Sequence, residues 1–372
     1  MNTNKDLNGI LPVNKPEGWT SFDVVAKLRG ILGIKRLGHA GTLDPMATGV
    51  LPVFVGKATK ACDILPVDEK SYLAGFKMGC VTDTQDSTGE ILSENDKAVS
   101  GDLLKATAAE FVGEIMQLPP MYSAVSVGGK RLYELARQGK VIERQARPRR
   151  VNFIEIQEYD EASRQGKMLV SVSKGTYIRT LINDIGEALG CGGIMTSLIR
   201  TSSGGFDIKE CLSLEDIQKY ADEDRLGEII LPVEKAFDSV YGKITLDKRC
   251  TPLYKNGVKL RCQQVGVKKS DENHGRIFCV YGFDGGFLGL GQVDVHGIDL
   301  RQQTGKTAGL VGNGQRDRGL AGTGIDLGCL GNTDKARVVV AVVLNGSIQH
   351  RKPVNGGAIL ACNGGHVTAV GG

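Results

Sequence analysis

The sequence predicts an α+β fold in which helices and loops flank a mixed sheet, followed by a smaller β-rich module. Short segments of alternating apolar residues recur along the 372 residues, and isolated helical segments separate them without a regular strand–helix–strand order. Strands interspersed with isolated helices favour an α+β sheet over a doubly wound parallel one. A chain of this length has room for two domains with buried cores.

Helices and strands are predicted along the chain from capping residues, glycine stops and the spacing of apolar residues. A first helix is predicted between a capping box at Thr20 and Asp23 and a glycine stop at Gly33, because apolar residues recur at helical spacing between them. Further helices are expected at 102–113, within 176–193, and at 213–223. Strands are predicted at 49–60, 70–80, 151–156, 167–175 and, after a boundary at 231–232, in pairs within 275–293.

Composition excludes several classes of protein. The chain carries a net charge of +4, so it is only mildly basic, which permits a nucleic-acid partner without arguing for one. Nine scattered cysteines show neither a C-x-x-C pair nor zinc-like spacing, and no apolar run approaches the roughly 20 residues that span a bilayer. With a polar start and no signal peptide, we expect a cytoplasmic protein with reduced thiols and no membrane or metal partner.

The segment "GHAGTLDPMATGVLP", residues 38–52, contains a single acid, Asp44, in a turn rich in glycine. One carboxylate with one histidine and no cysteine is too few ligands for a metal, and glycoside hydrolysis normally uses two carboxylates. Pro45 steers Asp44 towards an extended backbone. An ordinary Asp-Pro turn is an equally physical interpretation, and this segment alone favours it.

Two further segments offer aromatic and cationic side chains. In "KGTYIRT", an extended backbone would place Tyr177 and Arg179 on one face, and an arginine near Asp44 would orient that carboxylate and keep it ionised. In "EKSYLAGF", Tyr72 opens a strand and offers a stacking face. An edge-strand Tyr–Arg pair and a core or rim tyrosine are the alternatives, and spacing does not separate them.

A basic stretch at 129–150 is the clearest signal of a partner. Only Glu134 and Glu143 offset its positive charge, and Tyr133 is interleaved. A solvated charged surface is one interpretation, but charge of one sign in an irregular, glycine-hinged segment favours phosphate contacts, and RNA in particular. The cationic residues are Lys130, Arg131, Arg137, Lys140, Arg144, Arg147, Arg149 and Arg150.

Between about residues 9 and 300 the chain contains several long motifs that also follow one another in this order in a known protein family. They are "LPVNKPEGWTSFDVV", "GHAGTLDPMATGVLPVFVGKATK", "TDTQDSTGE", "QLPPMYSAVSVGGKRLYELARQG" and "GTYIRTLINDIGEALGCGGIMTSLIRTSSGGF". In these motifs the chain resembles the bacterial tRNA pseudouridine synthases of the class that modifies uridine 55 in the T loop. The resemblance implies a pseudouridine-synthase-type mixed or antiparallel sheet, an isomerase activity on tRNA, and no metal or redox cofactor.

The resemblance also implies roles for individual residues. Asp44 takes the position of the catalytic acid, acting as nucleophile or assisting glycal formation, and Arg179 that of its partner. Tyr72 matches the tyrosine that stacks on the target base, Tyr177 a second pocket tyrosine, and Leu198 an apolar pocket wall. The remaining matches are His39 against the T loop without an acid–base role, Asp86 as a weaker network partner of Arg179, and Lys15 with Pro16 as mainly structural.

The expected organisation has three parts. A catalytic domain covers 9–232 and includes a basic RNA-clamping loop at 118–150, and a small PUA-like RNA-binding module covers 233–300. Ser126 stands where the family pattern has lysine, which removes one phosphate contact. The glycine-rich tail 301–372 has no counterpart in the family pattern and no assignment, and its "GTGIDLG" lacks the flanking strand and helix of a dinucleotide loop.

Three functions follow from these observations. The first is a monomeric enzyme that isomerises uridine 55 of tRNA by base flipping. The second is a tRNA-folding chaperone whose catalysis is secondary, and the third is a guide-RNA-dependent relative that acts on ribosomal RNA. An intact Asp44 favours the first.

Overall fold

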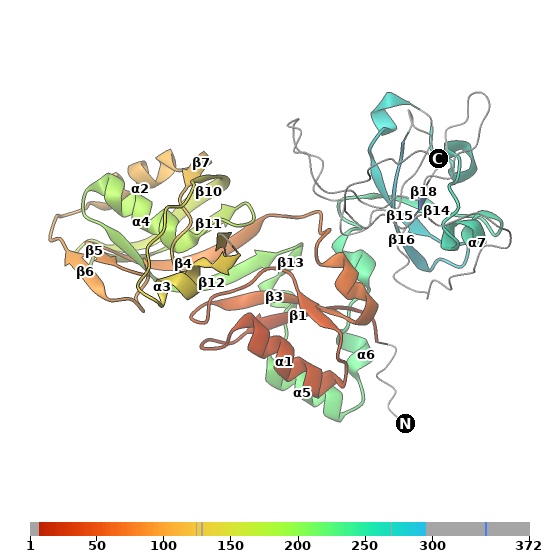
Figure 1. Cartoon of the computed structure of the whole chain (residues 1–372), viewed down its shortest axis with the longest axis horizontal. Coiled ribbons are helices and arrows are strands. Elements are labelled where there is room, and N and C mark those ends of the chain that lie inside the picture. Colours follow the sequence, from red (N-terminus) through yellow and green to blue (C-terminus); the bar gives the residue numbers. More distant parts are fainter. Residues whose placement is uncertain (1–6, 124, 128, 269, 295–338, 341–372) are drawn as a thin grey trace, which may run out of the picture.

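The computed structural model describes residues 7–123, 125–127, 129–268, 270–294 and 339–340. Within them, a nine-stranded sheet has seven strands in the order β1-β3-β12-β4-β11-β10-β7, with β2 added to β3 and β13 to β12 (Figure 1). All neighbours pair antiparallel except β3 and β12, which are parallel. The strands are β1 (Gly9–Lys15), β2 (Leu37–His39), β3 (Thr48–Val55), β4 (Lys70–Met78), β7 (Gly113–Gln117), β10 (Arg147–Asp160), β11 (Gln165–Val172), β12 (Gly193–Ser203) and β13 (Phe206–Asp207).

Two groups of helices cover different halves of this sheet (Figure 1). Helices α2 (Gly101–Glu110) and α4 (Ile178–Leu189) share a core with β4, β11 and β12. Helices α1 (Ser21–Leu32), α5 (Leu214–Asp222) and α6 (Leu226–Ile229) share another core with β1 and β3. The expected α+β architecture with a mixed sheet is therefore confirmed, and the β3–β12 contact joins the two halves.

The helix ends follow the sequence signals closely. Thr20 and Asp23 form the expected capping box of α1, and Gly33 ends this helix in a left-handed conformation with φ 66°. Ser213 caps α5 through its side chain, and Gly190 ends α4 at φ 73°. Local chemistry thus fixes where these helices stop, independently of the rest of the fold.

Two expected elements are shorter than their apolar patterns suggest. The helix expected at 102–113 ends at Glu110 with Phe111 as its C-terminal cap, and Gly113, at φ 115°, already begins β7 by pairing with Val151. The strand expected at 49–60 ends at Val55, where Gly56 turns the chain at φ 63° into a 3-10 helix, η2 (Gly56–Ala61). Both glycines take a conformation that other residues rarely adopt, and at each of them the chain changes from one element to the next.

A second, smaller sheet in the order β14-β15-β16-β18 lies in the C-terminal part (Figure 1). It has its own buried core, and a further apolar cluster joins it to the nine-stranded sheet through Phe54, Phe237 and Leu290. Of the tail 301–372, only the pair that forms β18 is described, and the rest lies outside the described residues. The elements are β14 (Gly242–Thr245), α7 (Cys250–Lys255), η5 (Cys262–Val265), η6 (Asp271–Asn273), β15 (Ile277–Tyr281), β16 (Phe287–Gln292) and β18 (Val339–Val340).

The remaining short elements connect these units. The polar turn expected at 82–90 joins the two strands of a hairpin, as the sequence predicted. In the described part of the chain, none of the helices has the length and hydropathy needed to cross a bilayer. The connecting elements are β5 (Cys80–Thr82), β6 (Ile91–Glu94), β8 (Ser126–Val127), β9 (Lys130–Arg131), α3 (Leu132–Ala136), η3 (Ile208–Glu210) and η4 (Val233–Ala236).

Candidate active site

Asp44 lies in the loop between β2 and β3, and this loop is anchored on both sides of it. On one side, the buried Ser21 hydroxyl accepts from the Leu43 amide at 2.9 Å and donates to the Leu43 carbonyl at 3.3 Å. On the other, the Pro45 carbonyl accepts from the Gly18 amide at 2.9 Å. The chain therefore fixes the backbone around Asp44 while leaving its side chain 46% exposed.

Lys15 is a second anchor of the same loop. Its side chain is completely buried, and its ammonium donates to the carbonyls of Pro16, Trp19 and Pro45. Burial lowers the pKa of Lys15 to about 8, an effect that the charge of Asp44 opposes. These contacts fit the structural role that the resemblance implies for Lys15.

Replacing Lys15 by methionine should lower the free energy of unfolding by about 1–3 kcal/mol, because three carbonyls lose their buried donor. The folded protein holds the Lys15 proton less tightly than the unfolded chain, so wild-type stability rises from about pH 8 to 10.5. That rise should be smaller in Lys15→Met. Urea unfolding at several pH values measures both effects, with the exposed Lys27→Met as control. An unchanged profile would show that Lys15 does not anchor the loop.

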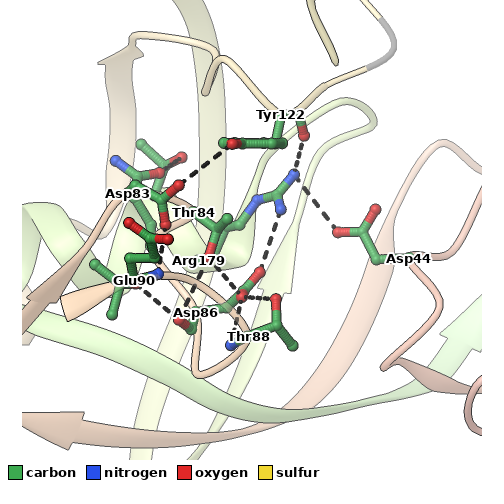
Figure 2. A network of polar contacts seen from close by, with 11 residues as sticks. Asp44, Asp83, Thr84, Asp86, Thr88, Glu90, Tyr122 and Arg179 are labelled. Carbon is green, nitrogen blue, oxygen red and sulfur yellow. Dashed lines mark hydrogen bonds and ion pairs between the residues drawn. The ribbon is translucent and has the colours of Figure 1, made fainter. Parts of the chain in front are cut away.

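Arg179 lies between two carboxylates that come from different parts of the chain (Figure 2). Its Nη2 is 3.6 Å from Asp44 Oδ2, and its Nη1 is 3.3 Å from Asp86 Oδ2. Nη2 also donates to the Tyr122 carbonyl. With its side chain only 7% exposed, the guanidinium is held by three partners and presents a fixed positive charge to Asp44.

Asp86 is held in turn by the hairpin that carries it (Figure 2). Its Oδ1 accepts from the hydroxyls of Thr84 and Thr88 and from the Thr88 amide at 3.0 Å. A bridge to Met195 of β12 fixes the turn to the sheet. Asp86 is 4% exposed, so this weaker candidate proves to be the buried second partner of Arg179.

The segment around Tyr177 and Arg179 is not a strand, so strand alternation does not bring these two side chains to one face. Tyr177 is the residue before α4, and Arg179 lies in the first helical turn. The two side chains still meet, since the guanidinium carbon lies 6.0 Å from the Tyr177 ring centroid. Gln117 holds the tyrosine backbone: its amide side chain accepts from the Tyr177 amide at 2.8 Å and donates to the Tyr177 carbonyl at 3.1 Å.

Tyr72 and Leu198 lie on the face of the sheet that packs against α4. Both belong to the same buried cluster, and Tyr72 on β4 pairs with Arg200 on β12. Burial raises the pKa of Tyr72, as does the charge of Asp44, while the nearby Arg200 opposes the shift. Tyr72 is 7% exposed and therefore neutral at pH 7, with a mainly apolar surface towards any ligand.

His39 ends β2, five residues before Asp44, and is half-buried. Its Nδ1 is buried without a hydrogen-bond partner among the described residues. Burial lowers the pKa of His39, and the charge of Arg200 adds to this effect. The His39 ring is therefore neutral at pH 7, and the expectation that it takes no acid–base role stays a prediction.

The basic segment 118–150 is more regular than its composition suggests. It contains the β8–β9 hairpin and α3, and its last arginines already belong to β10. Arg147 and Arg150 are exposed, whereas the Arg149 Nε donates to the Gly175 carbonyl at 2.9 Å. Lys130 and Arg131 lie on β9, next to β8 with Ser126, and their side chains lie outside the described residues.

Sequence reasoning missed three groups that shape this site. Gln117, the Tyr122 carbonyl and Arg200 all contact residues around Asp44 or Arg179. Only Arg200 carried a usable signal, because on a strand it falls two residues after Leu198 and so on the same face. Among the described residues, no group of His, Cys, Asp and Glu side chains has the geometry of a metal site.

Comparisons with known proteins agree with this geometry. The model of the TruB family pseudouridylate synthase N-terminal domain matches residues 29–178, and that of the tRNA pseudouridylate synthase B C-terminal domain matches 179–238. The chain is 43% identical over 296 residues to the tRNA pseudouridine synthase B of Clostridium novyi, across 80% of this chain and 99% of the relative. It is 42% identical over 292 residues to the protein of the same name from Staphylococcus saprophyticus, across 74% and 94%.

A solved structure extends the likeness to the fold. One chain of a Cbf5-Nop10-Gar1 complex aligns with 27% identity and a TM-score of 0.62, across 90% of this chain and 84% of that one. The family models together cover more than half of the chain, and the two relatives cover 80% and 74% of it. The motifs around Asp44, Asp86 and Arg179 lie inside these matches, so the chain belongs to the TruB family of pseudouridylate synthases.

Proposed function

We propose that this protein converts a uridine of tRNA to pseudouridine, at position 55 of the T loop as the resemblance of its motifs implies. The observation that carries the proposal is the single exposed carboxylate of Asp44 facing a fixed, buried Arg179. The names of its relatives, tRNA pseudouridine synthase B, support the choice of substrate. We also propose that it acts as a monomer in the cytoplasm and that the module at 233–300 binds tRNA away from the chemistry.

The reaction needs few protein groups. The bond between C1′ of the ribose and N1 of uracil breaks, the base turns, and C5 of the base bonds to C1′ while the C5 proton is released to solvent and N1 gains a proton. Asp44 acts as a nucleophile at C1′ or accepts the ribose proton whose loss forms a glycal. No water is consumed, which explains why a second carboxylate to activate water is unnecessary.

Substrate entry completes the site. The side chain of Asp44 is half exposed in the free protein, so the bound RNA itself has to exclude water from the reacting atoms. The target uridine is flipped out of its loop, which costs a few kcal/mol of stacking. Tyr72 and Leu198 then offer an apolar surface to the base, with Tyr177 beside Arg179.

Release of tritium from tRNA labelled at C5 of uridine tests this function. The purified protein should release tritium from an unmodified tRNA transcript without any added protein or RNA. Release that depends on a guide RNA or partner protein would favour the third function, for which the Cbf5-Nop10-Gar1 complex is the structural analogue. Binding and refolding of tRNA without release would favour the chaperone.

The exposed arginines of β10 should contribute to binding through charge. Replacing Arg147 and Arg150 by glutamine should weaken binding across different tRNAs. The slope of log affinity against log salt concentration should fall by about 0.7–0.9 for each phosphate that the variant no longer neutralises. Exposed Lys27 and Lys105 on α1 and α2, replaced by glutamine, give a control with the same charge change. Equal affinity and equal slopes in the two double variants would contradict an RNA contact at β10.

A further inference from the structure

Two cations lie on the same sheet face as the proposed base-binding residues. Lys70 and Tyr72 are two residues apart on β4, so their side chains point to the same side of the sheet. Arg200 pairs with Tyr72 across β12 and follows Leu198 by two residues. The face therefore carries an apolar surface next to a pair of positive charges.

The two cationic groups converge on Gly41, in the loop that carries Asp44. A side-chain carbon built on Gly41 would lie 3.4 Å from Arg200 Nη1 and 3.5 Å from Lys70 Nζ. Gly41 takes φ 86°, and its carbonyl accepts from Arg200 Nη2 at 3.1 Å. Even one added side-chain carbon would be in contact with both cationic side chains, so the glycine lets the loop that carries Asp44 approach the two charges closely.

No carboxylate forms a close ion pair with either cation in the described part of the chain. Neither Lys70 nor Arg200 has a carboxylate within 4.0 Å there, and Arg200 is completely buried with its Nη1 lacking a hydrogen-bond partner of normal geometry. Nearby Tyr72 and Cys211 both have raised pKa values because they are buried, so they are neutral at pH 7.

The surroundings of Lys70 add further positive charge. Lys174 lies close enough to act on it, and Asp68, the nearby carboxylate, is 4.0 Å from Lys174. Burial lowers the pKa of Lys70 to about 8, and the charges of Arg200 and Lys174 add to this effect. Asp68 opposes this shift but forms no ion pair with Lys70, and desolvated cations that lack a close counter-charge are unfavourable in a folded protein unless a ligand supplies one.

We propose that Lys70 and Arg200 bind a phosphodiester that flanks the flipped nucleotide, with Lys70 as the direct contact. This inference rests on the proposed function, because it takes RNA as the substrate. Gly41 and Asp44 belong to the same loop between β2 and β3, so we expect a ribose held at Asp44 to place one of its own phosphodiesters near Gly41. A lysine and an arginine are the side chains that best complement a phosphate, through charge-assisted hydrogen bonds.

The two cations differ in what a substitution would reveal. Arg200 also donates from Nε to the Val50 carbonyl of β3 at 2.7 Å and from Nη2 to the Gly41 carbonyl at 3.1 Å, so it holds the loop that carries Asp44 against the sheet in addition to its proposed role. Lys70 makes no such backbone contact among the described residues, which makes it the better test. Lys77 lies on the same strand but on the opposite face, and Lys77→Met is the matched control.

The decisive experiment combines a protein change with a backbone change in a T-stem-loop RNA. A methylphosphonate placed on the 5′ or the 3′ side of the target uridine removes the charge of one linkage. Equilibrium binding is measured with three proteins: Asp44→Asn, Asp44→Asn with Lys70→Met, and Asp44→Asn with Lys77→Met. All three carry Asp44→Asn so that the RNA is not converted during the measurement. A methylphosphonate at one of the two linkages should weaken binding of the RNA to Asp44→Asn about tenfold, which is the loss expected for a charge-assisted hydrogen bond.

Lys70→Met should weaken binding to unmodified RNA by a similar factor and make that linkage insensitive to the methylphosphonate. Lys77→Met should leave the sensitivity unchanged. Two results would overturn the proposal. One is that binding by the Lys70→Met variant remains as sensitive to the methylphosphonates as binding by Asp44→Asn alone, and the other is that Asp44→Asn alone is not sensitive to either methylphosphonate. The measurement on Asp44→Asn alone needs no lysine variant, so it still tests the proposal if Lys70→Met folds poorly.

Kinetics with the active protein provide an independent test. Lys70→Met should raise KM about tenfold, change kcat less than about twofold, and reduce the salt slope by about 0.7. Lys70→Arg should restore most of the affinity. A lower kcat with unchanged KM would instead make Lys70 a positioning residue and contradict the proposal. If wild-type protein bound the stem-loop without releasing tritium, the proposed function would fail while the binding experiment still tested the phosphate site.

Discussion

Asp44→Asn should abolish tritium release, with a loss of at least about 10⁴-fold in kcat, because the amide can neither attack C1′ nor accept a proton. Binding of tRNA should change less than about threefold. The substitution preserves size, and the side chain is half exposed, so folding does not depend on its charge. Tritium release and filter binding on the same preparation measure the two quantities separately.

The control for this prediction is Asp63→Asn, which removes a carboxylate outside the proposed site. It should match the wild type in both assays. Release by Asp44→Asn at more than about a hundredth of the wild-type rate would contradict the assignment of Asp44 as the catalytic acid. Loss of binding together with release would indicate that Asp44 holds the RNA instead.

Arg179→Met should remove activity and also destabilise the protein. It leaves the buried Asp86 without its cation, and breaking a buried ion pair from one side typically costs about 3–5 kcal/mol. Arg179→Lys keeps the charge, but one ammonium cannot reach Asp44, Asp86 and the Tyr122 carbonyl together, so we expect a loss of about 10²-fold in kcat.

A double variant separates stability from catalysis. Arg179→Met combined with Asp86→Asn removes the unpaired buried charge, so most of the lost unfolding free energy should return while activity should not. Urea unfolding and tritium release measure the two effects. Recovery of activity in the double variant would show that Arg179 acts only by stabilising the hairpin of Asp86, and would contradict its role beside Asp44.

Local signals in the sequence predicted most of the fold. The α1 capping box at Thr20 and Asp23, the glycine stops at Gly33 and Gly190, and the polar turn before β6 act through neighbouring atoms, and all appear as expected. Two ends were predicted wrongly: β3 ends at Val55 because Gly56 turns the chain at a positive φ, and α2 ends at Glu110 because the chain enters β7 from Gly113.

The site was less predictable because its contacts join distant segments. The pairing of Arg179 with Asp86 spans 93 residues, and the bonds from Gln117 to Tyr177 span 60. Spacing along the chain carries no information about such contacts. The sequence motifs themselves raised Asp44 and Arg179 as candidates, and the resemblance to a family gave them roles and added Asp86, whereas the folded structure was needed to find Gln117.

Lys70 and Arg200 are a second case in which a contact between distant segments could not be predicted from the sequence. Each appears in the sequence as an ordinary strand residue, and β-strand alternation alone relates them only to Tyr72 and Leu198. Both side chains lie next to Gly41 only because the loop after β2 folds over β12. Charge that lies together in space but not in sequence is therefore found only in the folded chain.

A crystal structure of the Asp44→Asn protein with a T-stem-loop RNA would show directly whether the reacting ribose binds beside position 44. We expect a flipped target uridine with C1′ about 3–3.5 Å from the substituted side chain, the near-attack separation, and with its base against Tyr72. A target nucleotide that stays stacked in its loop, or whose ribose binds away from position 44, would show that Asp44 is not the catalytic acid.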